Sequence, residues 1–386
     1  MSIAARRGIG VALAVVLVVG IGVAVVWGRN SGEAKPGDLV TVQGIIGSEK
    51  KPFFDDPEVA AVLARHGYVV KVRTAGSRQI ATSADLSGVD FVFPSSAPAG
   101  ERIKEVTGRS TSYAPFYSPM AVATFEPIVG LLEAAGIARQ DANGQWLFDV
   151  GKYLEAVASG TRWNDLPGAA TAYNTSRSLL LSSTDIRTSN SAAMYLSIVS
   201  YVASGNNIVT TAEQRDAIID QMSALFLQQG FSASSSEEPF DDYLSQGVGS
   251  KPLVMVYEAQ FLGQKMDAAT SGAITDDMVL MYPTPTVLSK HTLVPLTDAG
   301  DEVGRLLAED PQLQALAAQH GFRTSDTAVF ASTLRDHGLD VPPLPVDIVE
   351  PPAFESLEVM ITAITARYNT AVAPAKPASE PSSPTP

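Results

Sequence analysis

Hydrophobic and polar positions change their period sharply between residues 179 and 204, where the sequence reads LLLSSTDIRTSNSAAMYLSIVSYVAS. The three leucines at 179–181 are typical of the end of a buried strand. From Ala192 onward the apolar residues recur at the three-and-four spacing of a helix face. The segment therefore predicts a strand, a polar turn and a helix, in that order.

The turn within this segment is dense in hydrogen-bonding groups. Any residue from 188 to 191 can act as a helix N-cap, and the free N–H groups beyond it favour an anion or polar ligand. Arg187 adds a planar donor suited to a carboxylate or oxyanion. Ordinary capping with an Asp185–Arg187 surface pair explains the same residues, so both interpretations stay open. The candidate ligand contacts in this turn are Thr184, Asp185, Arg187, Ser189, Asn190 and Ser191.

Strands alternate with helices in the first part of the chain. Residues 39–46, 68–73 and 89–93 read as strands, and a helix that starts with the pair Asp56-Pro57 lies between the first two. This order predicts a parallel sheet, whose ligands bind beyond the carboxyl ends of the strands. The polar residues in the loops at those ends are Ser48, Lys50, Ser95 and Ser96.

The middle of the chain contains two candidate crossings between domains. Residues 121–124 are a short extended piece before a helix at 125–135, and residues 278–282 form a strand that ends at Tyr282. A buried strand at 252–257 places Tyr257 and Glu258 at its end. Residues 232–242 read as a loop with four acids, for which a solvated acidic loop and a calcium site are both conceivable.

The remaining pattern is helical, apart from a low-complexity end. Helices are predicted at 211–229, 298–308, 311–320, 325–337 and 353–368, and the tail 372–386 should be disordered.

Composition excludes several functions. The formal net charge of −14, without a lysine or arginine cluster, argues against nucleic-acid binding. The absence of cysteine excludes disulfides, thiolate metal sites and a lipid-modified cysteine. The four histidines and the familiar catalytic motifs give no reason to expect an enzyme, a metal or a cofactor, although a hydrolase with two distant carboxylates leaves no signature.

An uncharged stretch of about 20 residues, 8–27, matches a membrane-spanning helix. Arg6 and Arg7 precede it, which predicts a cytoplasmic N-terminus and an extracytoplasmic remainder. A cleaved signal peptide is the alternative, but the sequence after Trp27 lacks a small-x-small cleavage site. We therefore expect a single-pass membrane anchor.

The order of these pieces resembles the type II periplasmic substrate-binding protein family over residues 39–340. The resemblance rests on the segments GIIGSEKK, VDFVFPSSAP, YSPMAVAT, SSTDIRTSNSAAMY and YPTPTVLSKHTLVPLTDAG, followed by LAAQHGFR. It implies two α/β lobes, joined by two crossing strands, that close on a ligand. By position, Ser48, Ser95 and Ser96 would face the turn at 184–191, and Tyr257 and Tyr282 would lie near the cleft or hinge.

These observations predict a two-lobe periplasmic-binding-protein-like α/β fold with an N-terminal transmembrane helix. The expected parts are an anchor (1–30), a linker (31–38), lobe I (39–120 and 284–350), lobe II (121–283), a C-terminal helix (351–371) and the tail. We expect an extracytoplasmic solute-binding protein that captures a small anionic or polar molecule and presents it to an ABC-type permease. A non-transport envelope receptor with the same fold is the alternative.

Overall fold

The computed structural model describes residues 39–229, 237–340, 342–344 and 347–372. Within those ranges no helix is both long and apolar enough to cross a membrane. The expected anchor at 8–27 and the expected tail beyond residue 372 lie outside the described residues.

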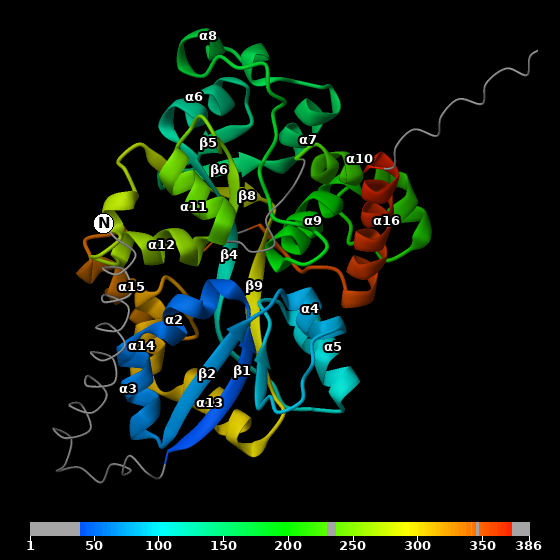
Figure 1. Ribbon diagram of the computed structural model, residues 1–386. Helices are drawn as coiled ribbons and strands as arrows, with labels where there is room; N and C mark the ends of the chain where they lie inside the picture. The colour runs from blue at the N-terminus through cyan, green and yellow to red at the C-terminus, as the bar shows by residue number, and fades with distance from the viewer. Residues whose placement is uncertain (1–38, 230–236, 341, 345–346, 373–386) are drawn as a thin grey trace, which may run out of the picture.

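One mixed sheet runs through the molecule, with strand order β2-β1-β3-β9-β4-β8-β6-β5. Its two long central strands, β4 (Tyr113–Phe125) and β9 (Thr286–Pro295), are antiparallel neighbours. In Figure 1 they run from the lower half of the molecule toward the upper half and connect the two. Residues before 120 therefore share a sheet with residues after 284, although the exact lobe boundaries remain a prediction.

Lobe I, the lower half in Figure 1, is built on parallel pairing of β1 with both β2 and β3, and β9 adds antiparallel to β3. Its strands besides β4 and β9 are β1 (Val40–Ile46), β2 (Tyr68–Thr74), β3 (Phe91–Phe93) and β10 (Arg323–Thr324). Its helices are η1 (Ser48–Lys50), α2 (Lys51–Asp55), α3 (Pro57–Arg65), α4 (Ser77–Thr82), α5 (Ala97–Thr107), α13 (Asp298–Glu309), α14 (Pro311–Gln319) and α15 (Thr327–Asp336).

Lobe II, the upper half, uses the second part of β4, which pairs antiparallel with β7 and β8. Its other strands are β5 (Ala138–Gln140), β6 (Trp146–Asp149), β7 (Val254–Tyr257) and β8 (Met278–Thr284). Its helices are α6 (Glu126–Ala134), α7 (Val150–Ala158), η2 (Trp163–Asp165), α8 (Ala169–Ala172), α9 (Asn190–Ala203), α10 (Ala212–Leu227), α11 (Glu237–Gln246), α12 (Glu258–Met266) and η3 (Ser271–Ala273).

Each lobe has its own hydrophobic core. The lobe I core contains residues of β1, β3 and α13, whereas the lobe II core contains β4, α9, α10 and β7. The C-terminal helix α16 (Phe354–Val372) follows the short strand β11 (Ile348–Val349) and buries Leu357, Met360, Ile361 and Ile364 in the lobe II core. It also contacts α5 of lobe I, so this helix touches both lobes.

Local signals explain why several elements begin and end where they do. Asp56 caps α3 by accepting a hydrogen bond from the Glu58 N–H, and Pro57 occupies the first turn. Gly67, with φ of +91°, ends this helix in the left-handed region that favours glycine. The predicted boundaries of α3 are thus confirmed by its caps.

Two expectations about secondary structure are wrong. The leucines at 179–181 belong to no strand: Leu179 and Leu181 are buried in a loop, and Ser182 forms only an isolated bridge with Val254. Their burial, rather than strand pairing, explains their apolar character. The acidic segment from Glu237 onward is part of helix α11, because Phe240 and Tyr243 anchor it in the lobe II core.

Candidate functional site

A cavity of about 200 Å³ lies where the two lobes meet. Lobe I contributes residues 47–49, 74–77, 79 and 95 to its lining, and lobe II contributes 188–190 and 257. Most of these residues follow the carboxyl ends of β1, β2, β3 and β7 or begin a helix. The cavity therefore occupies the position at which α/β sheets usually bind ligands.

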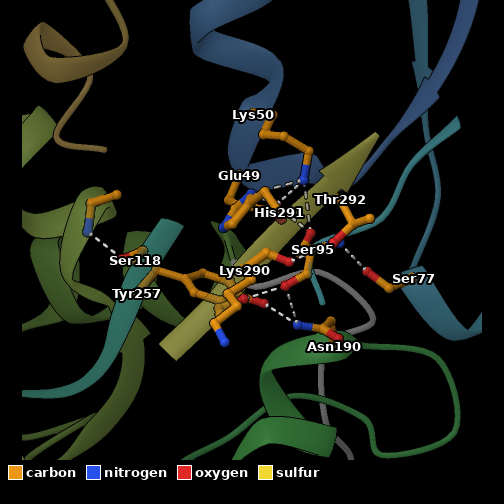
Figure 2. Close-up of polar contacts among 12 residues, drawn as sticks. Glu49, Lys50, Ser77, Ser95, Ser118, Asn190, Tyr257, Lys290, His291 and Thr292 are labelled. Atoms are coloured by element: carbon orange, nitrogen blue, oxygen red, sulfur yellow. Dashed lines mark hydrogen bonds and ion pairs between the residues drawn. The ribbon is translucent and has the colours of Figure 1, made fainter. Parts of the chain in front are cut away.

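A buried polar network forms one wall of this cavity (Figure 2). The Lys50 Nζ is fully buried and lies 2.5 Å from Glu49 Oε1, 2.8 Å from Ser95 Oγ and 3.1 Å from His291 Nδ1. Ser95 Oγ also donates to Glu49 Oε1. Because Glu49 and Ser95 line the cavity while Lys50 does not, the lysine lies behind the wall and holds the other two side chains in place.

Electrostatics keep Glu49 ionised in this network. Burial raises the pKa of Glu49, but the charge of Lys50 and hydrogen bonds from Lys50 and Ser95 outweigh burial and lower the pKa to about 2. Burial lowers the pKa of Lys50, against the opposing effect of Glu49. Glu49 is therefore a carboxylate at neutral pH, and it can only accept hydrogen bonds.

His291 on β9 is neutral in this setting. Burial, followed by the charge of Lys50, lowers the pKa of His291 well below its usual value. A charged lysine can only donate, so Nδ1 accepts from Lys50 and the ring proton is on Nε2. Nε2 is buried without a hydrogen-bond partner among the described residues, and the rings of Phe116, Phe322 and Tyr257 pack around the imidazole.

Ser95 also joins the two lobes through its main chain. Its N–H donates to Ser77 Oγ at 2.8 Å, and its carbonyl accepts from the Asn190 amide of lobe II at 3.1 Å. Asn190 donates as well to the Tyr257 hydroxyl at 3.0 Å. Burial and the charge of Glu49 raise the pKa of Tyr257 well above its usual value, so this hydroxyl stays neutral.

Helix α9 points its N-terminus at the cavity. Its N-cap, Ser189, makes no side-chain capping bond, so the N–H groups of its first turn are not satisfied by the cap side chain. Thr184 and Ser191 instead share a hydrogen bond of 2.7 Å, and Ser189 lies 3.1 Å from Ser191. This arrangement offers the positive end of a 14-residue helix to a ligand.

Two of the predicted contacts in this turn pair with each other. Arg187 makes two hydrogen bonds from Nε to the Asp185 carboxylate, at 2.8 and 3.0 Å, and a further one from Nη2. The guanidinium lies 5.5 Å from the ring centre of Tyr368 on α16. Neither residue lines the cavity. The Asp185–Arg187 pair of the alternative interpretation is thus present, whereas no side chain caps α9.

Glu258 and Tyr282 belong to a second buried cluster. Arg323 Nε and Nη2 donate to the two Glu258 oxygens at 2.6 and 2.9 Å, and the Tyr282 hydroxyl donates to Oε1 at 2.5 Å. These residues do not line the cavity. The cluster joins β10 of lobe I to α12 and β8 of lobe II.

The structure thus gathers only part of the predicted site. The predicted residues that line the cavity are Ser48, Ser95, Ser189, Asn190 and Tyr257. Those outside the lining are Lys50, Ser96, Thr184, Asp185, Arg187, Ser191, Glu258 and Tyr282. The predicted set omitted five polar residues of the lining, which are Glu49, Thr74, Ser77, Gln79 and Thr188. Glu49 lies between two predicted residues, Ser48 and Lys50, so its place in the first loop was a signal that could have identified it.

No family model and no curated protein sequence matches the chain. Solved structures of similar fold include the following three. The sulfate-binding protein SubI from Mycobacterium tuberculosis H37Rv aligns with a TM-score of 0.50 and 17% identity, over 83% of this chain and 96% of that one. A ferric binding protein from Campylobacter jejuni aligns with a TM-score of 0.51 and 9% identity, over 86% of this chain and 99% of that one.

Iron-bound HitA from Pseudomonas aeruginosa gives a TM-score of 0.50 and 11% identity, over 85% of this chain and 99% of that one. Identities this low establish the fold alone, and one of the three proteins is named for sulfate whereas the other two are named for iron. Among the described residues, no group of three or more His, Asp or Glu side chains could hold a metal ion. The chain has the two-lobe α/β fold of the type II periplasmic substrate-binding proteins.

Proposed function

We propose that the chain is an extracytoplasmic, membrane-anchored solute-binding protein that holds a small polar or anionic ligand between its lobes and presents it to an ABC-type permease. The observation that carries this proposal is the cavity, whose lining comes from both lobes. A ligand bound there would touch both lobes at once, so its binding energy would favour the closed arrangement.

The polar groups of the cavity support a small ligand. Ser48, Ser95 and Ser189 bring hydroxyls, and α9 brings the N–H groups of its first turn. The net charge of −14 does not oppose anion binding, because local donors decide affinity. The field of the distant charges is screened beyond about 10 Å at 0.1 M salt.

A thermal-shift screen of the full chain in detergent tests the proposal. Phosphate, sulfate, molybdate, amino acids and small carboxylates are the first probes. A ligand at about 100 times its Kd stabilises the folded state by roughly 2.7 kcal/mol. A reproducible shift with at least one probe is expected, and the absence of a shift with all of them would contradict the proposal.

The membrane anchor has its own test. After carbonate extraction the intact chain should stay in the membrane pellet, and protease added outside the cell should cut it after residue 30. A soluble mature form that begins near residue 30 would contradict the anchor.

The transport step is separable from ligand binding. Permease and ATPase genes next to the gene for this chain would support uptake. Their absence, together with a bound ligand, would favour a receptor that uses the same fold in the cell envelope.

A further inference from the structure

Glu49 is the one charged side chain in the cavity lining among the residues that the structure describes. Its side chain is only 4% exposed, and it is the middle residue of η1, which Gly47 separates from β1. No arginine or lysine from the described parts of either lobe lines the cavity beside it. A ligand in this cavity would therefore meet a fixed negative charge and otherwise neutral groups.

The carboxylate is held in one position. Lys50 Nζ and Ser95 Oγ both donate a hydrogen bond to Oε1. Gly47 makes room for it, since a β-carbon there would lie 2.2 Å from Ser95 Oγ and 2.6 and 2.7 Å from the two Glu49 oxygens. Such crowding on several sides leaves Glu49 little freedom to turn away from a ligand.

The cavity also has a donor side. Figure 2 shows Glu49 and Asn190 on opposite sides of Ser95, and Asn190 is the first residue of α9. The N–H groups of this helix start favour an acceptor or a negative group on the ligand. The cavity is thus polarised, with a hydrogen-bond acceptor on the lobe I side and donors on the lobe II side.

We infer that Glu49 determines specificity, and that the ligand carries an N–H or O–H donor for Glu49 together with an acceptor or anionic group for the start of α9. This inference rests on the proposed function and narrows its ligand class. A zwitterion, such as an amino acid, and an oxyanion that keeps a proton at neutral pH both have this chemistry.

A fully deprotonated oxyanion lacks the required donor. Its oxygen would face the Glu49 carboxylate with no proton between them, and two acceptors in a desolvated site repel each other. The loss of one charged hydrogen bond of this kind lowers affinity by roughly 10- to 100-fold. Sulfate should therefore bind much more weakly than phosphate or an amino acid.

The test measures probe affinities of the full chain in detergent by thermal shift and calorimetry at pH 7.5, with inorganic phosphate, glycine, glutamate and sulfate. Phosphate or one amino acid should bind at least about tenfold more tightly than sulfate. Tighter binding of phosphate would identify the ligand as a protonated oxyanion, and tighter binding of glycine or glutamate would identify it as a zwitterion. Sulfate binding equal to that of the best probe would overturn this inference but leave the proposed function standing. Absence of any binding would overturn both.

Glu49→Gln provides the decisive variant, because the glutamine amide can donate to an oxyanion. The ratio of sulfate affinity to that of the best probe should rise by at least about tenfold. An unchanged ratio would overturn the inference.

Glu302→Gln is the matched control, since Glu302 pairs with Arg305 outside the cavity, and it should leave the ratio unchanged. If Glu49→Gln fails to fold with Lys50 unpaired, Glu49→Gln/Lys50→Met removes both charges and should give the same change in ratio.

Discussion

Two buried carboxylates in this protein are paired with cations in different ways. Glu258 accepts two hydrogen bonds from the Arg323 guanidinium and one from Tyr282, so both of its oxygens are engaged by the protein. The hydrogen bonds that Glu49 accepts from Lys50 and Ser95 converge on one oxygen, in the wall of a cavity. The first cluster joins the lobes within the protein interior, whereas the second presents a charge to whatever enters the cavity.

The comparison shows that burial of an ion pair does not by itself mark a functional site. Arginine binds a carboxylate with a planar fork that satisfies both oxygens, whereas lysine is a point donor. The Arg323 pair therefore suits a structural role, and the Lys50 pair leaves capacity for a ligand. Each pair can be broken separately, and the two losses should differ.

Arg323→Met should cause the largest loss of stability. It leaves Glu258 buried with only Tyr282 as a partner, and an uncompensated buried charge costs about 3–5 kcal/mol. Chemical denaturation followed by circular dichroism measures the change. Arg305→Met is the control: its pairs with Glu302 and Glu309 are exposed, and it should cost less than about 1 kcal/mol. Equal losses for both variants would contradict the structural role of the Glu258–Arg323 pair.

Lys50→Met should have a smaller effect, of about 1–3 kcal/mol. Ser95 remains as a donor to Glu49, and water in the cavity can solvate the carboxylate. The neighbouring Lys51 provides a matched control, because its pair with Asp55 is exposed and Lys51→Met should be nearly neutral. A loss as large as that of Arg323→Met would show that water does not reach Glu49.

The network should also make the fold sensitive to acid. The folded-state pKa of His291 is depressed, so below pH 6.5 the unfolded chain takes up a proton that the folded chain does not, and stability falls. The pKa of Glu49 is depressed to about 2, so its contribution is present above pH 4.5 and is lost only as the pH falls from 4.5 toward 2. His291 therefore acts alone within this network between pH 6.5 and 4.5.

His291→Gln keeps a side-chain acceptor for Lys50 and removes this titration. It should reduce the dependence of unfolding free energy on pH by about 1.4 kcal/mol per pH unit over the lower part of that window. Urea titrations of both proteins at pH 6.5, 5.5 and 4.5 measure the difference. Parallel stability curves would mean that His291 is not the group that titrates.

Arg187→Ala should have the smallest effect. The side chain of Arg187 is 44% exposed, and its contacts with Asp185 and Tyr368 contribute less than about 1 kcal/mol together. Because Arg187 does not line the cavity, the thermal shift caused by a bound ligand should survive the substitution. Loss of that shift, with the unliganded Tm unchanged, would instead restore the expectation that Arg187 contacts the ligand.

Sequence patterns predicted the architecture well because helix caps, glycine stops and strand-end loops are local signals. The Asp56-Pro57 start of α3 and the helix that begins at Asn190 are examples. The site was harder to predict, since Lys50 and His291 are 241 residues apart in the chain and meet only because β3 pairs with both β1 and β9. No local sequence signal distinguishes a lysine whose side chain reaches into a cavity from one whose side chain turns inward toward a carboxylate.

The same limit applies to Arg187 and Glu258. Both are polar residues near predicted strand or helix ends, as a ligand contact would be. Their partners decide their roles: Asp185 is two residues away, whereas Arg323 lies 65 residues from Glu258. The sequence allowed the pairing of Arg187 as an alternative, but it gave no sign of the Glu258–Arg323 pair.

Binding of a small ligand in the cavity between the lobes is tested most directly by filling that cavity. Ser48 is half-buried in its lining, and Ser48→Trp would occupy much of a volume of about 200 Å³. Ser87→Trp, at an exposed position outside the lining, is the control. With the best probe from the thermal-shift screen, calorimetry should show binding to wild type and Ser87→Trp, and at least about 100-fold weaker binding to Ser48→Trp. Unchanged affinity in Ser48→Trp, with the variant folded, would place the ligand elsewhere and contradict a binding site between the lobes.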